Sequence, residues 1–258
     1  MDHHLTLWIG VAFSLIVSLV YFFIANTLKV RQFSPLDIDS KWAWNQFLIF
    51  WWSMGIVSLM PALQNVLGIF DVQRLSIYAS LLQLILVVIS VALWALQNYV
   101  FFIYFGTRKF IALSTLYYSF VYGFLLYFFA EHPVTRLKIE RWNVLLDYGV
   151  EPSSQVIMWL SIILILPLVL SALGYFSLYF RVKDATSKYR IFLVSWSLII
   201  WLASGLVVRL VNPQFADSDE WQMLNRVIAV ASSVLIFFAY RPPRFIKSRF
   251  KVLSIGEE

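Results

Sequence analysis

The chain alternates between long runs of apolar residues and short segments that contain most of its charges. Several runs exceed the roughly 18 apolar residues that are typical of a membrane-spanning helix. The pattern therefore predicts an all-α integral membrane protein, a seven-transmembrane helix bundle over residues 1–240 with a basic tail at 241–258. The expected spans are 5–28, 42–64, 75–105, 110–130, 156–180, 191–211 and 221–240.

The composition supports a membrane protein over a soluble one. Of the 258 residues, 61% are hydrophobic and only 13% are charged, whereas a soluble domain contains about 25% charged residues. The net charge of +6 is spread over basic clusters between the apolar runs, as in membrane proteins. We therefore expect a lipid bilayer, and no nucleic acid, as a partner. The lack of cysteine excludes disulfides and thiolate chemistry.

Lysine and arginine are distributed unevenly between the two sides that seven spans would define. The segments after the first, third and fifth spans, together with the tail, hold 14 of the 20 basic residues. The other side holds Arg74, Arg136, Lys138, Arg141, Arg209 and Arg226. Because cytoplasmic loops are enriched in basic residues, we predict an outside N-terminus, a cytoplasmic C-terminus and a location in the cell membrane.

The longest segment expected on the outer side covers residues 131–155. Its apolar residues Val134, Leu137, Trp142 and Leu145 recur at near-helical spacing, with basic residues between them. This spacing predicts an amphipathic helix, either packed against the bundle as a loop helix or lying on the membrane surface.

The central parts of the spans contain no Asp, Glu, Lys or His. Proton-coupled carriers and pumps usually need such groups at depth, and a retinal protein needs a lysine in its last span. The three histidines, His3, His4 and His132, all lie outside the expected spans. We therefore predict a protein that is not an enzyme and that has neither a metal site nor a cofactor.

Two arginines near the outer ends of the last two spans are candidate ligand-binding residues. Arg209 lies near the end of the sixth span, and Arg226 lies about one turn inside the seventh. In one interpretation both face the bundle and bind a small anion or a lipid headgroup. In the other they extend to the membrane interface or pair with acids of the loop between them, which are Asp217, Asp219 and Glu220.

Neutral polar residues in the third and fourth spans form a second candidate site. Gln83 and Gln97 lie two heptads apart and therefore near one helix face, and the fourth span contributes Tyr118 and Tyr122. They predict either a ligand cavity between the two spans or hydrogen bonds that hold the helices together. Pro167 in the fifth span is expected to kink that helix.

The tail begins with Pro242-Pro243, which should end the seventh span sharply. Basic and apolar residues then alternate, which favours contact with an anionic membrane surface or with a partner helix. The candidate contact residues are Arg244, Phe245, Lys247, Arg249 and Lys251.

This exit from the last span, Tyr240 to Phe250, together with the seven-span topology, resembles the seven-helix sensory regions of prokaryotic histidine kinases and related signalling proteins. The resemblance implies a receptor-like module that senses a ligand or the state of the membrane and signals through its last span. The residues after Tyr240 are too few for an output domain. We therefore expect the signal to pass to a separate membrane or cytoplasmic partner protein.

Two other functions fit the pattern. An accessory or structural subunit of a larger membrane complex would also have short loops, few intramembrane polar groups and many aromatic residues. A bundle of seven helices is also similar to small-solute transporters of the PQ-loop type. The only Pro-Gln pair, Pro213-Gln214, lies in an expected loop and not within a span.

Overall fold

The structure, a computed structural model, describes residues 3–29, 38–151 and 154–250. Seven of its helices are long and apolar enough to cross a membrane, so the predicted all-α bundle with seven long apolar helices is confirmed. These helices are α1 (His3–Lys29), α2 (Ile38–Ile69), α3 (Leu75–Phe105), α4 (Ile111–Glu131), α5 (Gln155–Ser177), α6 (Ala185–Val211) and α8 (Asp219–Tyr240). Most of their bounds lie close to the predicted spans, but α2 extends beyond its predicted span at both ends and α6 begins well before residue 191.

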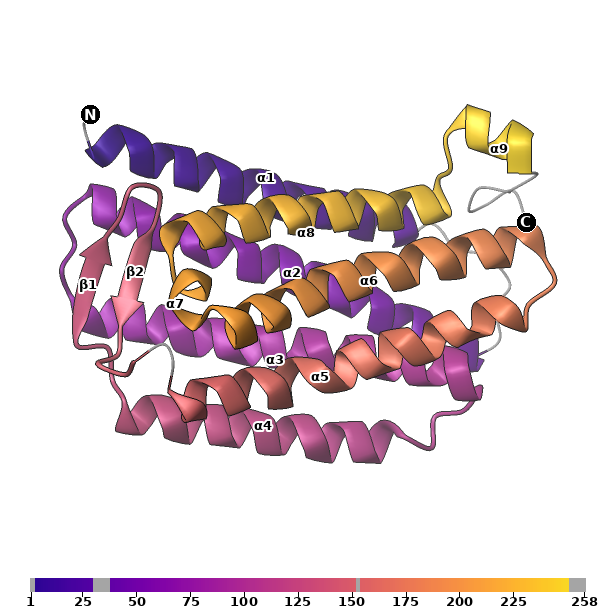
Figure 1. Cartoon of the computed structure of the whole chain (residues 1–258), viewed down its shortest axis with the longest axis horizontal. Helices are drawn as coiled ribbons and strands as arrows, with labels where there is room; N and C mark the ends of the chain where they lie inside the picture. The colour runs from indigo at the N-terminus through magenta and orange to yellow at the C-terminus, as the bar shows by residue number, and fades with distance from the viewer. Residues whose placement is uncertain (1–2, 30–37, 152–153, 251–258) are drawn as a thin grey trace.

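The long helices run back and forth along one axis (Figure 1). The shorter elements are β1 (Arg136–Ile139), β2 (Val144–Asp147), η2 (Leu178–Phe180), α7 (Pro213–Ala216) and α9 (Arg244–Phe250). The strands, α7 and the start of α8 lie together at what we call the hairpin end (Figure 1). The opposite end, where α8 finishes and α9 begins, is the tail end.

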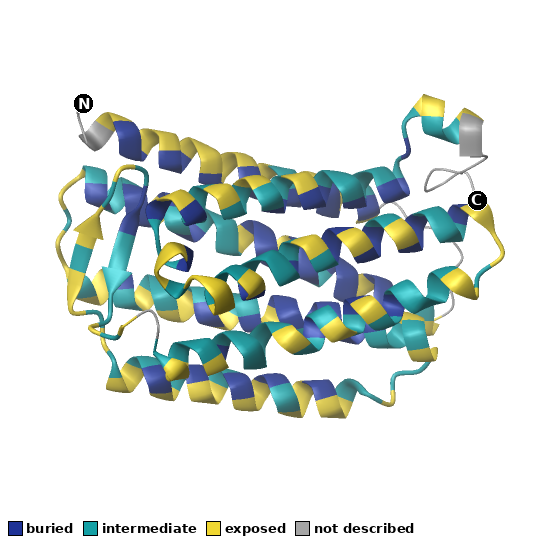
Figure 2. Ribbon diagram, viewed as in Figure 1, coloured by how far each residue is buried: buried dark blue, intermediate teal, exposed yellow. Residues whose placement is uncertain are grey.

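Six of the long helices form a closed ring, and α4 lies outside it. Successive neighbours around the ring are α1, α2, α3, α5, α6 and α8, and α8 returns to α1. The fourth long helix packs on the outside, against α3 and α5. Exposed residues therefore occur all along α4 (Figure 2).

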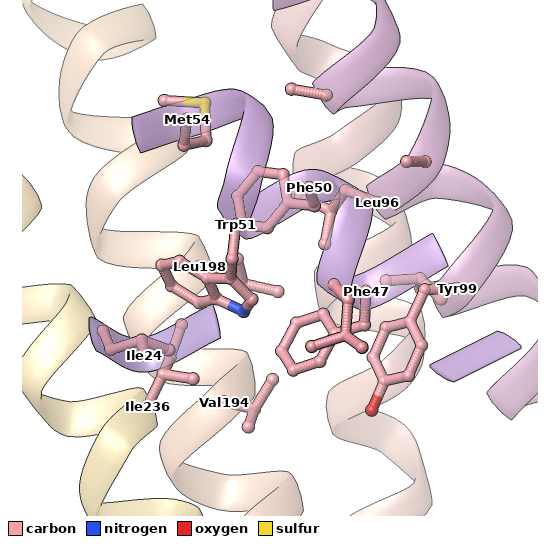
Figure 3. Close-up of a cluster of buried hydrophobic side chains, with 14 of the residues drawn as sticks. Ile24, Phe47, Phe50, Trp51, Met54, Leu96, Tyr99, Val194, Leu198 and Ile236 are labelled. Atoms are coloured by element: carbon pink, nitrogen blue, oxygen red, sulfur yellow. The ribbon is translucent and has the colours of Figure 1, made fainter. Parts of the chain in front are cut away.

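Large aromatic side chains fill the centre of the ring. Phe47, Phe50 and Trp51 of α2 are almost completely buried and meet side chains from α1, α3, α6 and α8 (Figure 3). The Phe47 ring stacks on Tyr99 of α3 with centroids 4.3 Å apart. A buried aromatic side chain contributes a large packed apolar area, so the inward-facing side chains of α2 make up a large part of the core.

The segment between α4 and α5 is a β-hairpin, so the predicted amphipathic helix at residues 131–155 is wrong. β1 and β2 pair antiparallel, with Arg136 opposite Asp147 and Ile139 opposite Val144. Residues 136–140 alternate polar and apolar side chains, and this period of two is that of a strand. The helix was predicted from the wider spacing of Val134, Leu137, Trp142 and Leu145, which also suits a helical period.

Candidate functional site

The hairpin is held against the bundle by Asn65 of α2. The Asn65 amide nitrogen donates to the backbone oxygen of Trp142 at 2.9 Å. Its amide oxygen accepts from the backbone nitrogen of Val144 at 2.9 Å. One side chain thus satisfies a backbone donor and a backbone acceptor of the hairpin, and only 1% of Asn65 is exposed. Gly10 of α1 makes this approach possible, because a β-carbon there would lie 1.8 Å from the Trp142 oxygen.

The start of α8 holds the same part of the hairpin from the other side. Asp219, only 5% exposed, accepts from the Trp142 backbone nitrogen at 2.9 Å and from the Asn143 amide nitrogen at 2.5 Å. Arg226, one of the two candidate arginines, donates to the Asn143 amide oxygen at 2.6 Å. The Asn143 side chain therefore bonds both Asp219 and Arg226 of α8. The Arg226 guanidinium points toward the hairpin and helps to hold it.

The other candidate arginine has a different partner. Arg209 in the last turn of α6 forms an ion pair with Asp217, which follows α7. This contact agrees with the interpretation in which the arginines pair with acids of the loop. The structure therefore assigns Arg209 and Arg226 to two separate contacts, Asp217 for the first and Asn143 for the second.

The hairpin also carries charged contacts on its exposed side, and Asp147 takes part in one of them. The Asp147 carboxylate accepts from the Gly149 backbone nitrogen at 2.9 Å and from Arg136 Nε at 2.5 Å. These two interactions, the backbone one first, lower the pKa of Asp147 below its usual value. Burial raises the pKa of the neighbouring Tyr148, so its phenol remains neutral over the physiological range.

The second candidate site, between α3 and α4, extends to α5. Gln97 donates to Ser171 of α5 at 2.6 Å, and the adjacent Asn98 is bonded to Ser114 of α4. Gln97 and Asn98 are 3% and 2% exposed, so both amides lie well inside the bundle. The polar layer, as we call Gln97, Asn98, Ser114, Tyr118 and Ser171, thus connects three helices.

Several atoms of the polar layer are buried without a hydrogen-bond partner in the described chain. They are Gln97 Oε1, Asn98 Nδ2 and the Tyr118 hydroxyl. Ser171 donates its only hydroxyl hydrogen to the Pro167 oxygen at 2.7 Å, so it accepts from Gln97 and leaves Oε1 unpaired. An unpaired buried polar group costs about 1–3 kcal/mol, and the layer therefore favours a molecule that completes these bonds.

The remaining two candidates are less enclosed. Tyr122 is half-buried and Gln83 is exposed. A helix of 3.6 residues per turn rotates by about 20° for every seven residues, so Gln83 is turned roughly 40° away from Gln97. Gln97 and Tyr118 are both buried in the bundle, whereas Gln83 lies on its outer surface.

The sequence interpretation missed Tyr117. Pro167 has no N–H, so the backbone oxygen of Ile163 loses its usual partner in α5. The Tyr117 hydroxyl donates to that oxygen, and α4 thereby supplies the hydrogen bond that the proline removes. A proline in one span and several tyrosines in the preceding span were visible in the sequence, but only the packing of α4 on α5 pairs them.

Four of the five predicted contact residues of the tail lie in the short helix α9. α8 ends at Tyr240, and Pro242-Pro243 separates it from α9, as predicted. Arg244 and Phe245 are exposed, whereas Lys247 is half-buried. Arg249 lies in α9, and Lys251 lies outside the described residues.

Within residues 3–29, 38–151 and 154–250, no three His, Cys, Asp or Glu side chains come together as a metal site would require. Comparison with protein-family models, curated proteins and solved structures finds no match to this chain.

Proposed function

We propose that this chain is a non-enzymatic seven-helix membrane sensor in which a small neutral molecule binds the polar layer and the signal passes to a separate partner protein. The observation that carries the proposal is the set of buried, unpaired polar atoms on Gln97, Asn98 and Tyr118. The nearby groups are amides and hydroxyls, so the layer suits a neutral ligand. Such a ligand donates to Gln97 Oε1 and accepts from the Tyr118 hydroxyl.

The position of α4 explains how binding would be transmitted. This helix lies outside the ring, and polar contacts at Ser114 and Tyr117 help to hold it against α3 and α5. A ligand that bonds α3 and α4 at once stabilises one position of α4 relative to the ring. An equilibrium between two positions shifts when the ligand has different affinities for them, and the partner would recognise one of the two.

Tyr118→Phe tests the proposal without disturbing the fold. The Tyr118 hydroxyl has no partner in the described chain, so its removal should not destabilise the protein. Wild type and variant are isolated from cells in native nanodiscs, and bound small molecules and proteins are identified by mass spectrometry. We expect wild type to carry a small neutral molecule, and the variant to bind it about fivefold more weakly because one hydrogen bond is lost. The proportion of bound partner should change as well.

A second candidate function is an accessory subunit of a larger complex. It is favoured by the outer face of α4, where Leu113, Leu116 and Phe120 are 59%, 70% and 69% exposed. Such a subunit would bring a stoichiometric protein partner, carry no small molecule and be unaffected by Tyr118→Phe. That combination would overturn the sensor proposal, as would wild-type protein that carries neither a small molecule nor a partner.

A further inference from the structure

A surface groove lies between α1 and α8 near the tail end of the bundle. It has a volume of about 400 Å³ and is lined by Phe23, Asn26, Thr27, Phe237 and Arg241. The two helices pack against each other and run in the same direction, from the hairpin end to the tail end (Figure 1). The groove is shallow and largely open to its surroundings.

The lining of the groove changes from apolar to polar toward the tail end. Phe23 and Phe237 form its apolar part, with ring centroids 5.6 Å apart. Asn26 and Thr27 follow Phe23 by about one turn, and Arg241 follows Phe237 by about one turn. At 1.5 Å per residue, the polar groups lie roughly 6 Å closer to the helix ends. This order suits an amphiphile whose head lies at the tail end.

The charge of the groove suits an anion. Arg241 is half-buried, and within the described chain its guanidinium has no hydrogen-bond or ion-pair partner. A guanidinium presents a planar set of donors that matches two oxygens of a phosphate. The Asn26 amide and the Thr27 hydroxyl add neutral donors beside it. Lys29, exposed in the last turn of α1, contributes a further positive charge.

We propose that this groove binds one anionic phospholipid, with its phosphate at Arg241, Asn26 and Thr27 and an acyl chain along Phe23 and Phe237. The positive-inside rule assigns the basic tail end to the cytoplasm, and the cytoplasmic leaflet is the one that is rich in anionic lipids. The lipid would join α1 to α8, the helix that leads into the tail. This proposal is independent of ligand binding at the polar layer.

Native mass spectrometry of the full chain in detergent tests the proposal. The protein is titrated with phosphatidylglycerol or phosphatidylcholine, and the bound lipids are counted. We expect about tenfold tighter binding of phosphatidylglycerol and the loss of most of that preference in Arg241→Gln, because charge-assisted hydrogen bonds to phosphate are the strong ones. Asn26→Leu, at an exposed position, should weaken phosphatidylglycerol binding about threefold. It tests the same groove if the arginine variant does not fold.

Arg181→Gln is the matched control. Arg181 is also an arginine at the tail end, but it is exposed, follows η2 and does not line the groove. Its replacement removes the same charge and should change lipid binding by less than about twofold. Equal losses in the Arg181 and Arg241 variants, or equal binding of the two lipids, would overturn the proposal. Displacement of phosphatidylglycerol by inorganic phosphate would instead assign the groove to a free anion.

Discussion

Gly10→Ala is expected to loosen the hairpin from the bundle. The added methyl group would lie 1.8 Å from the Trp142 backbone oxygen and 2.5 Å from Asn65 Nδ2, both well inside van der Waals contact. The carbonyl belongs to backbone that Asn65 and Asp219 hold in place, so α1 or the hairpin must move. Overpacking of this kind costs about 1–3 kcal/mol, against a gain of roughly 0.5–1 kcal/mol for alanine over glycine in a helix.

Gly123→Ala is the control for this substitution. A β-carbon at Gly123 in α4 meets no atom within 4 Å, so the helix-propensity gain should remain and the variant should be slightly stabilised. Thermal unfolding in detergent gives the global effect. Because the chain has no cysteine, maleimide labelling of Val144→Cys, a position only 4% exposed, reports opening of the hairpin. If Gly10→Ala and Gly123→Ala were equally stable and labelled at equal rates, the proposed close contact would be refuted.

Tyr117→Phe should destabilise the bundle by about 1–3 kcal/mol, because the backbone oxygen of Ile163 loses its partner from α4, and detergent unfolding measures the loss. Asp147 should make the hairpin sensitive to acid. Its folded pKa is lowered, so its contribution is present above the unfolded pKa of about 3.9 and is lost as the pH falls through the folded pKa. The test is the hydrogen-exchange rate of the hairpin amides in Asp147→Asn divided by the rate in wild type at the same pH. This ratio should exceed one at neutral pH and approach one in acid.

These two predictions have internal controls. Tyr122 is half-buried in the same helix as Tyr117, and its hydroxyl forms no hydrogen bond within the described chain. Tyr122→Phe should therefore leave stability unchanged, and an equal loss in the two phenylalanine variants would contradict the role assigned to Tyr117. For Asp147, an exchange ratio that is the same at neutral and acid pH would show that its carboxylate does not support the hairpin.

The sequence predicted the helices well because membrane helices are specified locally. In lipid, each span must satisfy its own backbone hydrogen bonds, so a run of apolar residues is enough to locate a helix. The predicted span at 75–105 has the same limits as α3 (Leu75–Phe105). The prolines at 242 and 243 likewise ended α8 by a local effect, the loss of a backbone donor.

The hairpin was not predictable in the same way. Its stability comes from Asn65, Asp219 and Arg226, which lie far from it in the sequence and do not alter its own pattern. For the same reason, Gly10 in the sequence is only one small residue in an apolar run. The contact with Trp142 becomes evident only when α1, α2 and the hairpin are placed together.

For the candidate sites, the sequence and the tertiary structure supplied different information. The sequence by itself determined which residue types were available, including two arginines near span ends and the amides of the third span. Only the tertiary structure decided their partners: Asp217 for Arg209, Asn143 for Arg226 and Ser171 for Gln97. Helix formation depends on neighbours in the chain, whereas the pairing of polar groups depends on the rotation and depth of separate helices, which are set by close packing of the aromatic core.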